Sequence, residues 1–137
     1  GGRMMVDMAV FIVGMLVWLQ VKHFIADYLL QPSWILRGKG DLREPGGYVH
    51  AGIHACGSLP VLIAGGLSAG WISALMAAEF VIHYLADHIK AVHSHTHPHP
   101  TNTLAFWALH GADQLIHHLT YSAMLLIILL ELPKSII

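Results

Sequence analysis

The sequence predicts an all-α integral membrane protein, a four-helix bundle with four transmembrane spans, and three observations support this fold class. First, 55% of its 137 residues are hydrophobic and only 11% are charged, whereas soluble domains carry about 25% charged residues. Second, four long apolar stretches alternate with connections that contain glycine, proline or charged residues. Third, no stretch shows the alternating pattern of a β-strand. The length fits a single domain, which we expect over residues 4–137.

The first span is expected from Met4 to Leu30, and residues 1–3 are interpreted as an added remnant before a native start at Met4 or Met5. Pro32 prevents easy continuation, so a polar connection is expected after it. The other spans are expected from about Val49 to Leu67, from about Ala69 to Val92, and from a cap at Thr101, Asn102 or Thr103 to Leu132, before Pro133. Stretches of this length cross a hydrocarbon core of about 30 Å.

Positively charged residues indicate the orientation. Arg37, Lys39 and Arg43 lie in the first connection, and Lys90 precedes the last one. Because cytoplasmic loops carry an excess of lysine and arginine, we expect these connections in the cytoplasm and both termini outside it.

The overall charge and the single cysteine exclude some classes of protein. The formal net charge is -1, which offers no basic face for a phosphate backbone, so no nucleic-acid partner is expected. Cys56 is the only cysteine, so it cannot form an internal disulfide, and we interpret it as a small residue packed in the core.

Polar residues recur inside the spans at intervals of three or four, which places them on one face of each helix. They are His23 and Asp27, then His50 and His54, then Glu79, His83 and Asp87, and finally His110, Asp113 and His117. Ionisable groups at membrane depth are costly and turn inward to pair or to bind metal. Counted from the expected helix ends, one histidine per span falls at the same level, so we predict one buried layer roughly 10 Å from the cytoplasmic ends.

This layer predicts a metal centre, because imidazole and carboxylate groups are ligands for zinc, iron or manganese, and helical bundles use them in dinuclear sites. The expected metal ligands are His23, Asp27, His50, His54, His83, Asp87, His110 and His117. Glu79 and Asp113 are the expected catalytic residues, as general bases toward a water molecule. The favoured function is a metal-dependent hydrolase acting on a membrane lipid or another membrane-soluble substrate.

Several alternatives stay open at this point. A di-iron oxidase uses the same ligand types, and a haem electron carrier needs only two facing histidines. The layer also suits a proton or metal-ion carrier or channel, with His110, Asp113 and His117 as a relay, or a purely structural network. Small residues at Ala74, Ala77, Ala78 and Gly57 suggest a face for homo-oligomers.

A second group of histidines alternates with other residues between the third and fourth spans, at His93, His95, His97 and His99. Four imidazoles in seven residues can hold a divalent metal. Without carboxylates or a fixed backbone, we expect modest affinity. A role in metal loading or sensing and an incidental solvated turn are both open.

The order of these polar residues resembles a known family. The string from Lys22 to Gln31 is followed by His50, His54, Glu79, His83, Asp87, Lys90, Asp113, Gln114 and His117. This pattern is similar to the small bacterial integral membrane family called domain of unknown function 3307. The resemblance implies a compact four-span protein of a bacterial inner membrane, encoded by a bacterium or its phage, and places Gln31 and Lys90 at the cytoplasmic mouth. It implies no particular activity.

Overall fold

The computed structural model describes the backbone of residues 1–136 and the side chains of residues 1–132. Its elements are α1 (Gly2–Phe24), the π-helix η1 (Ile25–Leu29), α2 (Ser33–Gly38), α3 (Gly46–Ala64), α4 (Ala69–Thr96) and α5 (Leu104–Ile136). All regular elements in this described part are helices, which confirms the all-α prediction. Four segments are long and apolar enough to cross a membrane: α1 with η1, and α3, α4 and α5.

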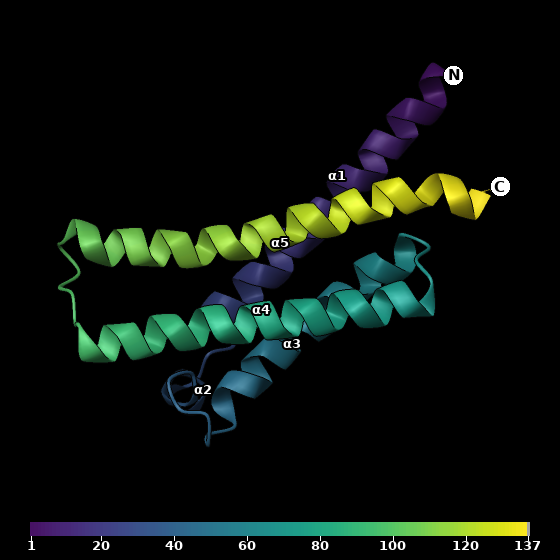
Figure 1. Cartoon of the computed structure of the whole chain (residues 1–137). Coiled ribbons are helices and arrows are strands. Elements are labelled where there is room, and N and C mark those ends of the chain that lie inside the picture. The colour runs from purple at the N-terminus through teal and green to yellow at the C-terminus, as the bar shows by residue number, and fades with distance from the viewer. Residues whose placement is uncertain (137) are drawn as a thin grey trace.

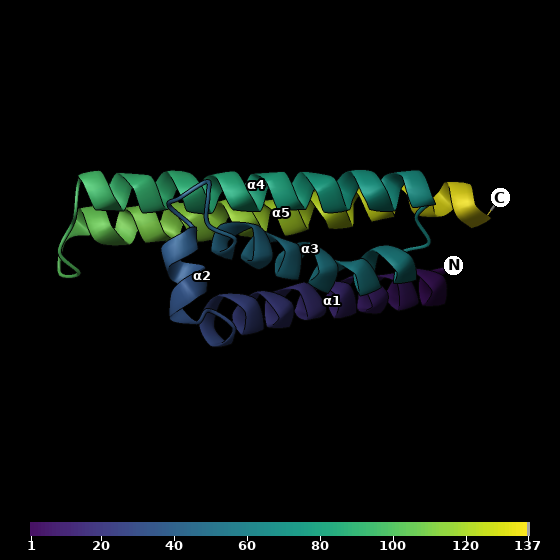
Figure 2. The same ribbon diagram turned by 90° about the horizontal axis from the view of Figure 1, so that it is seen from below.

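The four long helices form a bundle in which α4 and α5 run side by side as a long hairpin (Figure 1). Viewed from below, α1 and α3 lie against this hairpin, and both termini are at the same end of the bundle (Figure 2). The short helix α2 lies near the other end, where α1 finishes and α3 begins. The turn between α4 and α5 extends beyond that end because α4 and α5 contain 28 and 33 residues, whereas α3 contains 19.

Several helix boundaries differ from the sequence-based expectation. The stretch after Pro32 is partly helical. Its helix α2 is anchored by Ile35, which packs into the interior and is 2% exposed. Helix α3 begins and ends three residues earlier than expected, and α4 continues to Thr96. Pro133 does not end α5, which continues to Ile136; membrane helices tolerate proline where other groups satisfy the freed carbonyl.

Two glycines allow α2 to close onto α3. A Cβ atom on Gly46 would lie 2.5 Å from the carbonyl oxygen of Trp34 and 2.8 Å from the Cα of Ile35. A Cβ on Gly38 would lie 2.6 Å from the Cα of Gly46. Because these neighbours are backbone atoms, only glycine fits at this crossing. The connection that carries Lys39 is thereby held against the bundle.

The bundle is divided into an apolar half and a polar half. The buried residues of the half near the termini are Met15, Leu19, Val61, Leu62, Leu67, Leu75, Tyr121, Met124, Leu125 and Ile128. This half of the bundle therefore has a packed core of apolar side chains. The polar residues of the spans are therefore concentrated in the other half, toward α2.

On α3, Gly57 makes a contact within the chain, because a Cβ there would lie 2.5 Å from Cγ of Lys22, and its carbonyl accepts a hydrogen bond from Trp18 Nε1 at 2.8 Å. One sequence-based interpretation on this helix is wrong. Cys56 is exposed and not in the core, because the buried face of α3 is formed by its neighbours Ala55 and Ser58.

Candidate metal centre

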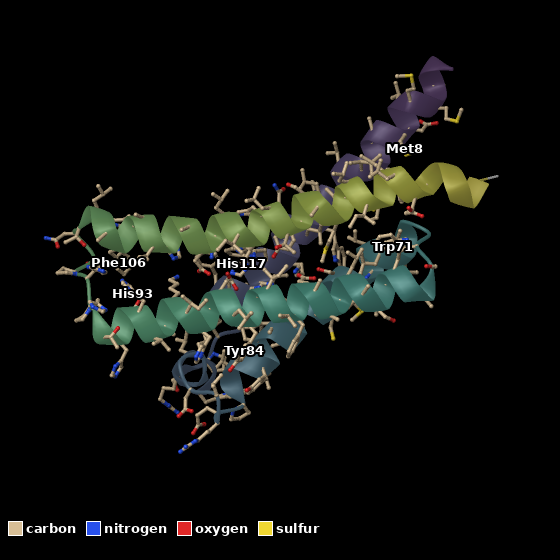
Figure 3. The ribbon with its side chains drawn as sticks, in the orientation of Figure 1. Met8, Trp71, Tyr84, His93, Phe106 and His117 are labelled. Carbon is tan, nitrogen blue, oxygen red and sulfur yellow. The ribbon has the colours of Figure 1, made fainter. Side chains whose placement is uncertain are left out.

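Histidines from all four long helices meet in the polar half of the bundle. Figure 3 shows nitrogen and oxygen atoms gathered around His117 between α4 and the neighbouring helices. The ring centroids of His54 and His83 are 3.8 Å apart, and those of His83 and His117 are 3.9 Å apart. His50 lies 5.0 Å from His83, and His23 lies 5.5 Å from His54. These five residues are at most 4% exposed, so they form one buried cluster.

Asp27 enters this cluster from η1. The π-helical turn, closed by a 2.9 Å bond from the Leu30 amide to the Ile25 carbonyl, widens the end of the first span at this carboxylate. The Gln31 side-chain amide donates to the Asp27 carbonyl. Single π-helical turns occur frequently at functional sites. The sequence showed only the i, i+4 spacing of His23 and Asp27 and gave no sign of the wider turn.

The Asp27 carboxylate is surrounded by imidazoles. Its Oδ1 lies 2.7 Å from His54 Nε2 and 3.1 Å from His50 Nε2. Its Oδ2 lies 3.2 Å from His23 Nε2 and 3.2 Å from Gln114 Nε2. Its side chain is 10% exposed. All three imidazoles are therefore placed to share the negative charge of Asp27.

Each of the other three carboxylates of the cluster has its own lysine. The pairs are Lys22 with Glu79 at 2.6 Å, Lys39 with Asp87 at 2.9 Å and Lys90 with Asp113 at 2.9 Å. Among the side chains of residues 1–132, no lysine or arginine forms an ion pair with Asp27. An isolated buried carboxylate is very costly. Asp27 is therefore bonded only by imidazole and amide groups among the described side chains, and a metal ion or a protonated histidine beside it would be strongly stabilised.

The second acid of the cluster, Asp87, lies between three histidines. Its Oδ2 is 3.3 Å from His83 Nε2 and 3.4 Å from His50 Nε2. Its Oδ1 is 3.7 Å from His117 Nε2. The same nitrogen of His117 lies 3.0 Å from Asp113 Oδ1. Asp27 and Asp87 are thus joined through His50.

Two of these buried imidazole nitrogens have no hydrogen-bond partner, namely His50 Nε2 and His83 Nε2. Ligand atoms of a tetrahedral ion with bonds of about 2.0–2.1 Å are separated by about 3.3–3.4 Å. The separations of 3.3 Å and 3.4 Å from Asp87 Oδ2 agree with this value, and the 3.1 Å from His50 Nε2 to Asp27 Oδ1 is close to it. The donor set fits a divalent metal such as zinc, iron or manganese.

Two overlapping sets of residues can hold an ion: Asp27, His50, His54 and His83 in one, and His83, Asp87 and His117 in the other. Within the first set, His54 differs from its neighbours. Lys22 Nζ lies 3.3 Å from His54 Nδ1, and an ammonium group can only donate, so Nδ1 accepts. The proton of His54 is then on Nε2, which donates to Asp27. His54 therefore orients Asp27, whereas His50 and His83 have free nitrogens.

A cavity of about 290 Å³ leads from the surface to three acids of the cluster. Its wall includes Asp27, Asp87 and Asp113, and its polar rim includes Lys39 and Lys90. The remaining wall residues are Tyr28, Gln31, Leu36, Ala91, Ser94, His110 and Gln114. A small molecule or headgroup that enters this cavity reaches the carboxylates directly.

Comparison with known proteins gives the family. The sequence profile described as "Protein of unknown function (DUF3307)" matches residues 15–136. The chain belongs to this family. No curated protein and no solved structure matches the chain. The matched range of this DUF3307 chain contains every residue of the histidine and aspartate cluster, and the resemblance seen in the sequence is confirmed.

The structure of the DUF3307 chain places four predicted site residues, His23, Glu79, His110 and Asp113, outside the two metal-binding sets. His110 lies about 10 Å along α5 from His117, where its Nδ1 is 3.1 Å from Lys90 Nζ. His23 contacts Asp27, but its ring nitrogens also lie 2.7 Å from the Tyr121 hydroxyl and 2.6 Å from the Gln114 amide oxygen. Glu79 is bound by Lys22. Asp113 is also in neither set, and like His110 it lines the cavity.

Sequence reasoning missed some residues that shape the site. Lys39 was assigned to a cytoplasmic loop, yet it reaches Asp87. Tyr121, which is 1% exposed, donates or accepts at His23 and lies under the Lys22 ammonium at 4.5 Å. No local spacing links these residues, because their partners are on other helices. A buried lysine in a span, such as Lys22, was the one available signal.

Proposed function

We propose that this chain is an integral membrane metalloprotein that binds one divalent metal ion, zinc, iron or manganese, in the buried cluster. The ligands are Asp27, His50 and His83, which belong to one of the two sets, with His54 orienting Asp27. The observation that supports this most directly is the charge of Asp27, which has only imidazole and amide partners among the described side chains. A divalent cation satisfies that charge and the unpartnered nitrogens of His50 and His83 together.

We further propose that the protein hydrolyses a lipid or another membrane-soluble substrate with an anionic headgroup. A bound divalent ion supplies Lewis acidity beside the cavity. Asp113 is the better of the two predicted bases, because it lines the cavity, whereas Glu79 is not among the residues that line it. Asp113 accepts the proton of an attacking water, and Lys39 and Lys90 hold the anionic group at the rim.

The geometry gives less support to the alternative functions. A carrier or channel needs a polar path across the whole bundle, but the half near the termini is a packed apolar core. A haem needs space for its ring, but the imidazoles of His54, His83 and His117 are in contact at 3.8 Å and 3.9 Å between centroids. Both metal-binding sets include His83, so the sets share a ligand, which favours one ion over a di-iron pair.

Orientation and location complete the proposal. The cavity opens in the polar half, on the side of α2 and the lysines. By the excess of positive charge we assign this side to the cytoplasm, with both termini on the other side of a bacterial inner membrane.

Metal analysis tests the centre. Protein purified in mild detergent is analysed by inductively coupled plasma mass spectrometry, for the wild type, Asp27→Asn, His50→Ala and the control Asp7→Asn. Asp7 is exposed and forms an ion pair with the exposed Arg3. We expect the ion of the buried cluster in the wild type and the control, and one ion per chain fewer in both cluster variants. A wild-type protein without stoichiometric metal, in a monodisperse and folded preparation, contradicts the proposal.

A separate assay tests the hydrolase. The protein is reconstituted in vesicles of phosphatidylethanolamine and phosphatidylglycerol, and released products are separated by thin-layer chromatography. Asp113→Asn is expected to retain metal and lose product release, whereas Asp41→Asn, on the exposed loop, retains both. Equal product release by wild type and Asp113→Asn rejects Asp113 as the base.

A further inference from the structure

The turn between α4 and α5 brings histidines together outside the buried cluster. Helix α4 continues to Thr96, so His93 is helical and His97 follows as the helix C-cap. The chain then folds back, and His99 Nε2 lies 3.4 Å from His93 Nε2. The rings of His93 and His97 are 5.0 Å apart between centroids. Figure 3 shows His93 at this turn, opposite Phe106 of α5.

The separation of the two nitrogens suits a shared ion. Two imidazole ligands of a tetrahedral ion with bonds of about 2.0–2.1 Å are about 3.3–3.4 Å apart, and the observed separation is 3.4 Å. His93 and His99 are only partly exposed, so they are more restricted than free surface side chains. The pair is therefore close to the geometry of a chelate.

The backbone of this turn is fixed, contrary to the sequence-based expectation. Trp107 Nε1 donates to the Thr101 carbonyl at 2.8 Å, and Thr103 Oγ1 donates to the Pro100 carbonyl at 2.6 Å. The His97 amide donates to the His93 carbonyl at 2.7 Å. Pro98 and Pro100 further restrict the chain. A rigid turn lowers the entropy lost when its side chains close on an ion.

The tautomer of His97 also favours binding. Thr96 Oγ1 donates its proton to the carbonyls of Val92 and His93, at 3.0 Å and 3.2 Å. The contact of 2.9 Å between Thr96 Oγ1 and His97 Nδ1 is then a bond that His97 donates. Its Nε2 is left with a free lone pair. Hydrogen bonds of this kind fix the tautomer of metal-binding histidines.

We propose that His93, His97 and His99 form a second metal site, which takes a divalent transition-metal ion such as Zn²⁺, Ni²⁺ or Cu²⁺. His93 and His99 provide the close pair of nitrogens, and His97, whose ring lies 5.0 Å from that of His93, provides the third donor once its side chain turns toward the pair. The set contains only imidazoles, which select these ions over Mg²⁺ and Ca²⁺. The site is independent of the buried cluster and does not rest on the function proposed above.

The chain offers a matched control in the same segment. His95 is exposed and lies on another face of α4, beside Arg37 and Gly40 at a separate cavity. If this segment bound metal without a defined geometry, all four histidines would contribute equally. The site proposed here does not use His95.

The experiment measures Cu²⁺ and Zn²⁺ binding to the full chain in detergent, with Asp27→Asn as background to remove the buried centre. We compare three proteins: Asp27→Asn alone, Asp27→Asn with H93A/H99A, and Asp27→Asn with His95→Ala. Equilibrium dialysis is expected to show one bound Zn²⁺ that is lost in H93A/H99A and kept in His95→Ala. Electron paramagnetic resonance of the Cu²⁺ form is expected to show coupling to two or three imidazole nitrogens.

Other outcomes overturn the proposal. Unchanged Zn²⁺ stoichiometry in H93A/H99A shows that the turn does not bind, and an equal loss in His95→Ala shows unspecific binding by the tract. Thermal unfolding midpoints check that the variants are folded, which is expected because the substituted side chains lie outside the core. Comparison with wild type separates the two sites, because failure of the buried centre leaves the Zn²⁺ bound to the turn unaffected.

Discussion

The ammonium group of Lys22 lies 2.6 Å from the Glu79 carboxylate in the middle of the bundle, and their side chains are 6% and 2% exposed. Lys22 also donates to the His54 carbonyl at 3.1 Å. The aliphatic carbons of its side chain pack against Gly57, where there is no side chain to obstruct them. One side chain from α1 thus connects α3 and α4, at the boundary between the apolar core and the histidine cluster.

Removing one partner of this pair is expected to destabilise the protein. Lys22→Met leaves Glu79 as an unpaired buried charge, which costs about 3–5 kcal/mol. Lys22→Met combined with Glu79→Met is expected to restore part of that loss, because no charge is left alone. Unfolding in detergent gives the free energies. Arg3→Met, in an exposed ion pair, serves as the control, with a change below about 1 kcal/mol. Additive effects of the two buried substitutions contradict the coupling.

The crossing of α2 and α3 gives a second prediction, on stability. Gly46→Ala places a methyl group against backbone atoms 2.5–2.8 Å away, so α2 must shift and the expected loss is about 1–3 kcal/mol. Gly14→Ala is the matched control, because no atom lies within 4 Å of its Cβ position. It is expected to be neutral or slightly stabilising. Equal thermal midpoints for the two variants reject the close crossing.

Metal binding at the buried cluster is expected to stabilise the folded state. At a free ion concentration one hundred times the Kd, the gain is about 2.7 kcal/mol. The increase in thermal midpoint on adding Zn²⁺ is expected to vanish in His50→Ala and to persist in His118→Ala, since His118 is exposed. Both are tested in the H93A/H99A background, so that the turn does not contribute. A similar increase in the two variants argues against His50 as a ligand.

Metal affinity is expected to fall as the pH is lowered. His50 and His83 bind an ion only as neutral imidazoles, so each proton that competes for a ligand weakens binding by up to about tenfold per pH unit below the pKa of that ligand. The Kd for the metal ion is therefore expected to be higher at acid pH. Titration with Zn²⁺ between about pH 8 and pH 6 measures the slope. An affinity that does not change over this range argues against histidine ligands.

The sequence by itself determined the four apolar spans and the polar faces, since hydropathy and the i, i+4 spacing are local properties. Which polar residues meet depends on how far each helix extends, and the sequence does not show this. Counting from expected helix ends placed His110 in the buried layer. The hairpin of α4 and α5 instead extends beyond α3, so His117 meets His83 and His110 meets Lys90.

The sequence also does not show which charged side chains form ion pairs. Each lysine partner comes from another part of the chain: Lys39 from the connection after α2, and Lys22 from α1. Only the tertiary structure decided that three acids are neutralised and that Asp27 is left to histidines. The physical reason is that a buried charge is balanced by whatever lies next to it in space, and proximity between helices is set by packing rather than by sequence distance.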